Sequence, residues 1–279
     1  MPRNRLAMVA VILVASTAFQ SQARAEAPLP FGRGGDWQMI FSDEFDGTSL
    51  DPSKWNTCFW WSSDGCTNKG NRDLQWYLPK NVSVDNGSLI LTAQPETVTA
   101  PDGITYDFTS GMVSTGSYYA EPHTPPLFAA KFGYYETRAK LPEGRGMFPA
   151  FWLSPSDYQV LPEIDVVETI GQEPNILTTN FHYRNRDGRT VHIGHRTKTV
   201  NLSEDWHVYG IRWRPGAIIW YLDGIEVWRF AKEEFVPDVP MHLYVTLTVG
   251  GNWPGRPDKT TPFPSRLLVD YVRVWQPVQ

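Results

Sequence analysis

The chain has 279 residues with 30 acidic and 25 basic side chains, and its formal net charge of −5 argues against nucleic acid or a strongly anionic polymer as partner. A hydrophobic fraction of 41% is enough for a large core, and a β-sandwich of this length can form one domain. The 12 Trp, 12 Tyr and 14 Phe exceed what packing usually requires, so some of these aromatic side chains are expected to bind a ligand.

Residues 1–25 have the pattern of a secretory signal peptide. Two arginines precede an apolar stretch over residues 6–14, and Ala23-Arg24-Ala25 has the form of a cleavage site. The apolar stretch is too short to span a membrane. Cleavage would remove three arginines and no acids, which moves the net charge from −5 to about −8. We therefore expect a secreted or periplasmic protein whose single domain covers residues 26–279.

Cys58 and Cys66 are the two cysteines, and they flank a short segment that contains Trp60 and Trp61. In an exported chain such a pair usually forms a disulfide. The alternative is two free thiols, since a metal site would need more ligands than this segment offers. A disulfide here would fix the two tryptophans as an aromatic platform.

Short strands and turns dominate the rest of the chain. Asn86-Gly87 predicts a turn before the first clear strand, and Pro215-Gly216 and Asp223-Gly224 predict the turns of a three-stranded meander. We expect one short helical turn, at Ala231 to Phe235. The expected strands cover residues 88–92, 132–141, 206–213, 217–222, 225–230 and 268–275. Many short strands with Gly and Pro between them predict an all-β fold, an antiparallel β-sandwich.

Three carboxylates occur within six residues, in the strand-like run Glu163-Ile164-Asp165-Val166-Val167-Glu168. Side chains alternate along a strand, so Glu163 and Asp165 share a face while Glu168 would lie on the other. A β-bulge at the two valines would bring Glu168 back to the first face. The two glutamate carboxyl groups would then lie about 5–6 Å apart, the separation found in retaining glycosidases. The alternative is an acidic strand edge in solvent, but the valines indicate a half-buried strand where grouped acids are costly.

An aromatic run, Met147 to Leu153, precedes these acids and includes Pro149-Ala150-Phe151-Trp152. With this run and its bulged acidic strand, the chain resembles glycoside hydrolase family 16, in its laminarinase-like branch. The resemblance extends from about Trp37 to Pro277. It implies a jelly roll with a substrate cleft on its concave sheet, with Glu163 as nucleophile, Glu168 as acid/base and Asp165 as the residue that holds the nucleophile by a hydrogen bond.

The same resemblance implies a set of substrate-binding residues. Trp152 would stack under a sugar ring, although it could instead be a core tryptophan, and His182 would lie in the cleft, although a lone strand histidine is usually structural. Phe148 replaces the Trp that is common in the family at its position, which weakens the expected stacking. Further substrate contacts are expected from Asn71, Arg72, Trp76, Trp253, Trp60 and Trp61.

We expect no catalytic metal, because the histidines lack zinc-ligand spacing. The resemblance implies a structural calcium held by the backbone carbonyls of Glu44 and Gly87 and by the carboxylate of Asp270, which could otherwise be an ordinary charged residue of the last strand. We expect no cofactor for catalysis and a monomeric protein.

Three functions are compatible with the sequence. The first is a secreted, retaining endo-hydrolase of β-1,3-glucan or mixed-linkage β-1,3-1,4-glucan. The second is a hydrolase of agar- or carrageenan-type galactan or of a bacterial exopolysaccharide, with Arg184, Arg186 and Arg189 contacting anionic groups, unless these form an ordinary solvated loop. The third is a non-catalytic glycan-binding protein, which an intact set of three acids disfavours. In each case the partner is a polysaccharide.

Overall fold

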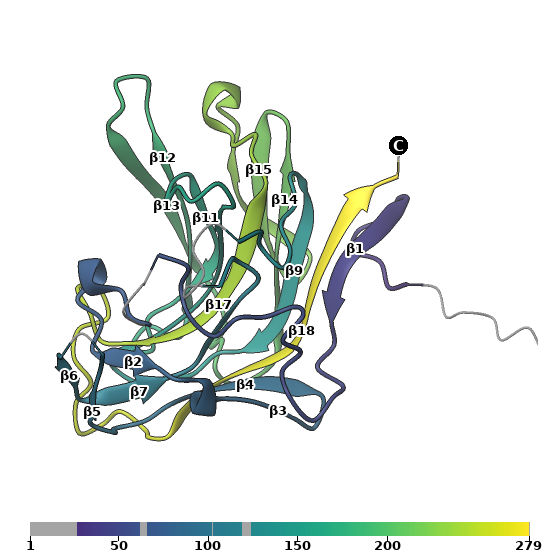
Figure 1. Cartoon of the computed structure of the whole chain (residues 1–279). Helices are drawn as coiled ribbons and strands as arrows, with labels where there is room; N and C mark the ends of the chain where they lie inside the picture. Colours follow the sequence, from purple (N-terminus) through teal and green to yellow (C-terminus); the bar gives the residue numbers. More distant parts are fainter. Residues whose placement is uncertain (1–26, 62–65, 102, 119–123, 279) are drawn as a thin grey trace, which may run out of the picture.

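The computed structural model describes residues 27–61, 66–101, 103–118 and 124–278. The predicted signal peptide lies outside these residues. The described chain is almost entirely β-structure, arranged as two large antiparallel sheets packed face to face, with β1 and the C-terminal strand β18 side by side (Figure 1). This confirms the predicted all-β sandwich. In the described part of the chain, no helix is long and apolar enough to cross a membrane.

The larger sheet has eight strands in the order β16-β15-β14-β9-β18-β4-β3, and β1 pairs with β18 beside this path. Its strands are β1 (Trp37–Asp43), β3 (Val82–Asp85), β4 (Ser88–Ala93), β9 (Gly133–Lys140), β14 (His207–Arg214), β15 (Ala217–Leu222), β16 (Ile225–Phe230) and β18 (Ser265–Pro277).

The second sheet has six strands in the order β13-β12-β11-β10-β17-β8. These are β8 (Met112–Ser114), β10 (Met147–Pro155), β11 (Glu163–Glu168), β12 (Ile176–Arg184), β13 (Thr190–Lys198) and β17 (Met241–Val249). The strand with the three acids, β11, is therefore an inner strand, held between β10 and β12.

Two small sheets and three short 3-10 helices complete the fold. Strands β2 (Gln75–Tyr77) and β7 (Phe108–Ser110) pair in parallel, and β5 (Val98–Thr99) pairs with β6 (Thr105–Tyr106). The helices are η1 (Lys69–Asn71), η2 (Pro79–Asn81) and η3 (Glu233–Phe235). The last of these confirms the predicted helical turn.

The predicted strands agree closely with the observed ones, and β14, β15 and β16 form the expected meander. Tyr134 and Glu136 of β9 lie on the face of this sheet away from the main core, yet both are buried. Residues 28–33, which we call the N-terminal strap, lie over this face: the Phe31 N–H donates to Glu136 Oε2 at 2.9 Å, and the carbonyl of Pro28 accepts from Trp275 Nε1 at 2.8 Å.

The main core lies between the two large sheets and takes large side chains from both, including Trp213 and Trp220 from one and Phe151 and Phe181 from the other. Burial of this apolar surface is the main driving force for the sandwich. Because the inner face of the six-stranded sheet is apolar, its polar side chains lie on the opposite face, where the site described below is found.

Candidate active site

A β-bulge in β11 places all three acids on the outer face of the six-stranded sheet. Val166 and Val167 follow each other in the chain, yet both belong to the core with 1% and 2% of their surfaces exposed. The register with β12 shifts between Asp165 and Glu168, where three steps along β11 match two along its partner. A second shift occurs against β10. The predicted bulge is confirmed, and it returns Glu168 to the face of Glu163 and Asp165.

His182 on β12 lies against the two first acids. Its Nε2 is 2.9 Å from Asp165 Oδ2 and 3.6 Å from Glu163 Oε1. Asp165 was expected to hold the nucleophile by a hydrogen bond of its own, whereas the structure places an imidazole in contact with both carboxylates. The side chain of Asp165 is only 2% exposed, while that of Glu163 is 30% exposed toward the cleft. The backbone carbonyl of Asp165 accepts a hydrogen bond from Trp220 Nε1 at 2.8 Å, which anchors β11 to the core.

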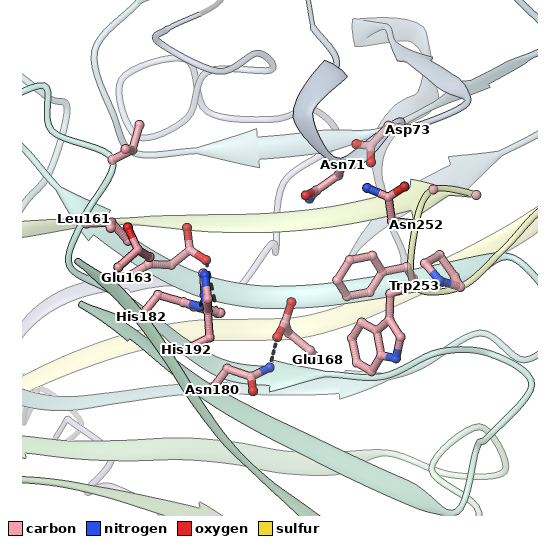
Figure 2. A pocket seen from close by; sticks show the side chains of 16 residues that line it. Asn71, Asp73, Leu161, Glu163, Glu168, Asn180, His182, His192, Asn252 and Trp253 are labelled. Carbon is pink, nitrogen blue, oxygen red and sulfur yellow. Dashed lines mark hydrogen bonds and ion pairs between the residues drawn. The ribbon is translucent and has the colours of Figure 1, made fainter. Parts of the chain in front are cut away.

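Glu168 has a separate environment. Its Oε2 accepts a hydrogen bond from Asn180 Nδ2, and Asn180 lies on β12 opposite Asp165. Sequence analysis did not find Asn180, because the pairing of β12 with a bulged strand cannot be inferred from spacing alone. Figure 2 shows Glu163 near the two histidines, and Glu168 joined to Asn180 by a hydrogen bond.

Burial raises the pKa of all three carboxyl groups. For Glu168 loss of solvation is the largest cause and the charge of Asp165 the second, and together they raise its pKa to about 8 despite the hydrogen bond from Asn180. Burial also raises the pKa values of Glu163 and Asp165, and the nearby His182 opposes the rise for Glu163. Three such close acids cannot all be ionised at neutral pH, so they share protons. Of the causes acting on Glu163, the nearby His182 is the one that favours its ionised form.

The acids open into a cleft of about 450 Å³. Its walls come from the loop before β11, from β12 and β13, from the segment after β17 and from η1, as Figure 2 shows. None of its lining residues in the described chain is Lys or Arg; they are Asn71, Asp73, Phe148, Val160, Leu161, Glu163, Glu168, Asn180, His182, Thr190, His192, Gly250, Gly251, Asn252, Trp253 and Pro254. A smaller pocket continues from it past Phe59, Trp152 and Asp165.

Two aromatic surfaces line these spaces. Phe148 and Trp253 form an edge-to-face pair with ring centroids 5.1 Å apart, and Trp253 is 39% exposed. Trp152 stacks on the buried Tyr244 at 4.0 Å and is half-buried, so one of its faces is supported by protein. Such supported rings can stack against a sugar ring, as predicted for these residues.

Trp60 and Trp61 lie behind this surface. Cys58 and Cys66 form the predicted disulfide, with Cα atoms 4.9 Å apart. Trp61 stacks on Phe59 and lies 6.2 Å from Trp152, while Trp60 packs edge-on against Trp61. Among the described residues of this loop, Phe59 lines the pocket. The loop thus supports Trp152. Trp60 and Trp61 do not line the two pockets described above, and their contact with a sugar stays a prediction.

The predictions for residues 71–76 are partly wrong. Asn71 lines the cleft, but Arg72 is exposed outside the lining, in a left-handed conformation (φ 57°) that ends η1. Trp76 is 5% exposed and packs against Tyr106 with ring centroids 5.1 Å apart. Side chains alternate along β2, so Gln75 and Tyr77 face the cleft side, while Trp76 faces away. We therefore correct the assignment of Trp76 from substrate binding to the core.

Asp73 is a cleft residue that sequence analysis missed. Its side chain is 8% exposed, and burial raises its pKa to about 7. Oδ2 accepts from Gln75 Nε2 at 3.1 Å, and the position of Gln75 is fixed because its Oε1 accepts from the Val249 N–H. Oδ1 is buried at the cleft without a hydrogen-bond partner in the described chain. In the sequence, only the closeness of Asp73 to the predicted substrate-binding residues Asn71 and Arg72 could have indicated that it lies at the cleft.

The proposed calcium ligands lie on the eight-stranded sheet, away from the cleft. The pairings of β18 with β1 and β4 bring the ends of those strands, next to Glu44 and Gly87, toward Asp270. However, Asp270 Oδ2 accepts from Arg138 at 2.8 Å, and the Glu44 side chain pairs with Arg273. One carboxylate oxygen of Asp270 is therefore already paired with a cation. The calcium site remains a prediction.

Comparison with known proteins places the chain in a family. The family model described as glycosyl hydrolases family 16 matches residues 70–272. The chain belongs to glycosyl hydrolase family 16. The laminarinase catalytic domain from Thermotoga maritima MSB8 is similar in structure, with a TM-score of 0.76 and 33% identity, over 88% of this chain and all of that one.

Sequence relatives agree with this assignment. The endo-1,3-1,4-beta-glycanase ExsH of Rhizobium meliloti is 34% identical over 85% of this chain and 51% of its own length. The chain thus spans about half the length of the first curated relatives it matches. A beta-glucanase of Rhodothermus marinus is 30% identical over 99% of this chain and 96% of its own length.

Proposed function

We propose that this family 16 protein is a secreted, retaining endo-glycoside hydrolase that cleaves β-1,3-glucan or mixed-linkage β-1,3-1,4-glucan. The observation that carries the proposal is the bulge, which places Glu163 and Glu168 on the same face of β11, toward one cleft. The printed names of the relatives, which include endo-1,3-1,4-beta-glycanase and laminarinase, support the glucan. The signal-like residues 1–25 support export.

In the first step, a carboxylate oxygen of Glu163 attacks the anomeric carbon as Glu168 gives its proton to the departing glycosidic oxygen. The raised pKa of Glu168 keeps it protonated at neutral pH. The bond to the leaving sugar breaks, and a covalent bond joins the sugar to Glu163. In the second step, Glu168 takes a proton from water as the water oxygen attacks the same carbon and releases Glu163.

His182 and Asp165 control the charge of the nucleophile. The imidazole Nε2–H, 3.6 Å from Glu163 Oε1, favours the ionised form of Glu163. Asp165 opposes this with its own negative charge unless it holds a proton or shares the imidazole hydrogen at 2.9 Å. After the first step Glu163 is neutral, so the electrostatic cost falls and Glu168 can remain ionised as a base.

Two features of the cleft favour a neutral polymer. Sugar rings can stack on Trp152 and on the pair Phe148 and Trp253, and the described lining has no Lys or Arg to bind sulfate or carboxylate. A keratan-sulfate endo-1,4-beta-galactosidase of Sphingobacterium multivorum is also related, at 28% identity, so an anionic galactan is the second candidate. Against it, Arg184 donates to the Gly188 carbonyl within its own hairpin.

Stereochemistry tests the mechanism. Proton NMR of freshly released product from laminarin should show the β-anomer before mutarotation, because two displacements at one carbon restore its configuration. The α-anomer as first product would refute the retaining mechanism.

Substrate class is tested separately, by reducing-sugar release from laminarin, lichenan, agarose and carrageenan at low salt and at about 0.5 M salt, where charge interactions are strongly screened. Salt-sensitive cleavage of carrageenan alone would favour the second candidate.

The role of Glu168 is tested with the leaving group. Glu168→Ala should lose activity on laminarin but keep the first step on an aryl glycoside with an acidic phenol, which departs without a proton. Glu168→Gln serves as the isosteric control. Equal loss on both substrates would contradict the acid/base assignment.

A further inference from the structure

We propose that His192 is a positioning residue that orients the His182 ring so that its Nε2–H is directed at the catalytic carboxylates. The inference rests on the proposed function for its effect on catalysis, although the orientation itself can be measured without substrate. No role was predicted for His192 from the sequence.

The two histidines are cross-strand neighbours. His182 on β12 pairs with His192 on β13, and both side chains line the cleft. Their Nδ1 atoms are in hydrogen-bond contact, with ring centroids 4.6 Å apart and ring planes at 68°. In Figure 2 the imidazole of His192 lies beside that of His182, on the side away from Asn71 and Asp73. The contact therefore uses the ring nitrogen of His182 that does not face the acids.

The proposal assigns the hydrogen positions. Nε2 of His182 lies 2.9 Å from Asp165 Oδ2 and 3.6 Å from Glu163 Oε1, and it carries a hydrogen when these carboxylates are ionised. In the neutral ring, Nδ1 of His182 is then an acceptor and must receive a hydrogen from Nδ1 of His192. In the protonated ring, Nδ1 of His182 is a donor and needs a lone pair on His192. A neutral histidine meets both demands by changing its tautomer, whereas most side chains meet only one.

The surroundings of His192 favour its neutral form. Partial loss of solvation and, second, the charge of His182 lower the pKa of His192. The charged groups that face the pair are Glu163 and Asp165 on β11, and the charge of His182 also lowers the pKa of Glu168. His192 itself is exposed on the edge strand β13, and within the described chain the ion pairs of Glu163 and Asp165 are with His182, so His192 acts through His182.

Loss of His192 should therefore change the ionisation of the acids more than substrate binding. In His192→Phe, the His182 Nδ1 loses its partner and the ring can turn its Nε2–H away from Asp165 and Glu163. The imidazole of His182 then lowers the pKa of Glu163 less than before. The acidic limb of kcat/KM against pH should therefore move to higher pH. Each unit of that movement lowers kcat/KM about tenfold on the acidic side. KM should change little, because the role proposed for His192 is to orient His182 and not to hold a sugar.

The experiment compares three variants of the whole protein on the β-glucan that the unsubstituted protein cleaves. His192→Phe should shift the acidic limb upward, and His192→Asn, whose amide can donate or accept, should restore most of it. His195→Ala is the matched control on the same strand, where the ring stacks on Trp228 at 6.2 Å, and it should keep the original profile. An unchanged profile in a folded His192→Phe would overturn the proposal.

Nitrogen-15 NMR of the histidine rings provides a readout without turnover. In the unsubstituted protein, neutral His182 should carry its hydrogen on Nε2 and His192 on Nδ1. His182 in the Nδ1–H form would overturn the proposal, and this result does not depend on the folding of any variant. If no β-glucan is cleaved, the proposed function fails, while the tautomer measurement still decides the orientation of His182.

Discussion

The carboxylates of the two large sheets differ in their ion-pair partners. On the eight-stranded sheet, Glu44 pairs with Arg273 and Asp270 pairs with Arg138. On the six-stranded sheet, the three acids of β11 are crowded together, and in the described chain their only ion-pair partner is His182. Burial raises the pKa values of all three, so their ionised forms are costly in the folded state.

Burial alone does not explain this difference. Glu136 on the eight-stranded sheet is fully buried and its pKa is also raised, but both of its oxygens accept hydrogen bonds, from Tyr271 and from the Phe31 N–H. Asp73 in the cleft keeps one oxygen without a partner. The comparison shows that the eight-stranded sheet satisfies these acids within the fold, while the cleft keeps acids available to a substrate at a cost in stability.

The largest effect is expected at the nucleophile. Glu163→Gly should reduce hydrolysis of laminarin to background, because no carboxylate remains to attack, and added azide or formate should restore turnover of an activated aryl glycoside through the vacated space. Reducing-sugar and product analysis measure both effects. Glu173→Gln, at an exposed acid paired with Arg196, is the control and should keep full activity. Substantial laminarin hydrolysis by Glu163→Gly would refute its role.

The next effect is one of stability. The folded-state pKa of Asp73, about 7, is above its ordinary value of 3.8. Between these pH values the folded protein binds more protons, so the free energy of unfolding should fall as pH rises from about 4 to about 7. Asp73→Asn should remove the part of this decline that Asp73 causes and stabilise the protein by on the order of 2–4 kcal/mol at pH 8, measured by denaturant unfolding. Asp187→Asn, in an exposed turn, should leave the decline intact; a decline of equal size in Asp73→Asn would contradict the assignment.

Substitutions of Trp152, which lines the cleft, and of Trp76, which is packed outside it, should differ in their effect on glucan affinity. Trp152→Ala should weaken glucan binding by about 1–3 kcal/mol, since it removes a large apolar surface from the cleft. Calorimetric titration of a laminarin oligosaccharide into the inactive Glu163→Gln background measures this loss. Trp76→Phe should leave the affinity unchanged, because Trp76 packs against Tyr106 outside the cleft. A matching loss of affinity in Trp76→Phe would restore the original prediction for that residue.

The smallest effect is expected on the other sheet. Glu44→Gln removes the pair with Arg273, in which Glu44 is 37% exposed, and should destabilise the protein by about 0–1 kcal/mol. In the same denaturant assay, Glu44→Gln should lower the free energy of unfolding, whereas Asp73→Asn should raise it. Stabilisation by Glu44→Gln at pH 8 would show that acids on both sheets are equally unfavourable, and the contrast between the sheets would then fail.

The sequence predicted most of the fold because local signals were strong. The two adjacent valines of β11 revealed the bulge, and the paired Gly-containing turns gave the bounds of β15 and β16 without error. Trp76 was misassigned because its role was inferred from the resemblance alone, whereas in the structure its ring packs against Tyr106.

Other features depend on contacts between distant segments. The burial of Glu136 requires the N-terminal strap, which comes from more than a hundred residues earlier in the chain. Asn180 and His192 acquire their places only through the register of β12 against β11 and β13. No spacing rule within the sequence fixes that register, because β13 is an exposed edge strand with weak alternation.

The strap also sets an order of events during folding. Its partners are Glu136, Gly224 and Trp275, at sequence separations of 105, 191 and 247 residues from Phe31, Arg33 and Pro28. The first described residues to be synthesised can therefore dock only after the last strand has been made and β9, β15 and β18 have assembled. Contacts this distant form slowly because the closure of such long loops is entropically costly. We expect the beginning of the described chain to be the final segment to fold, so that Glu136 remains open to water until folding is complete.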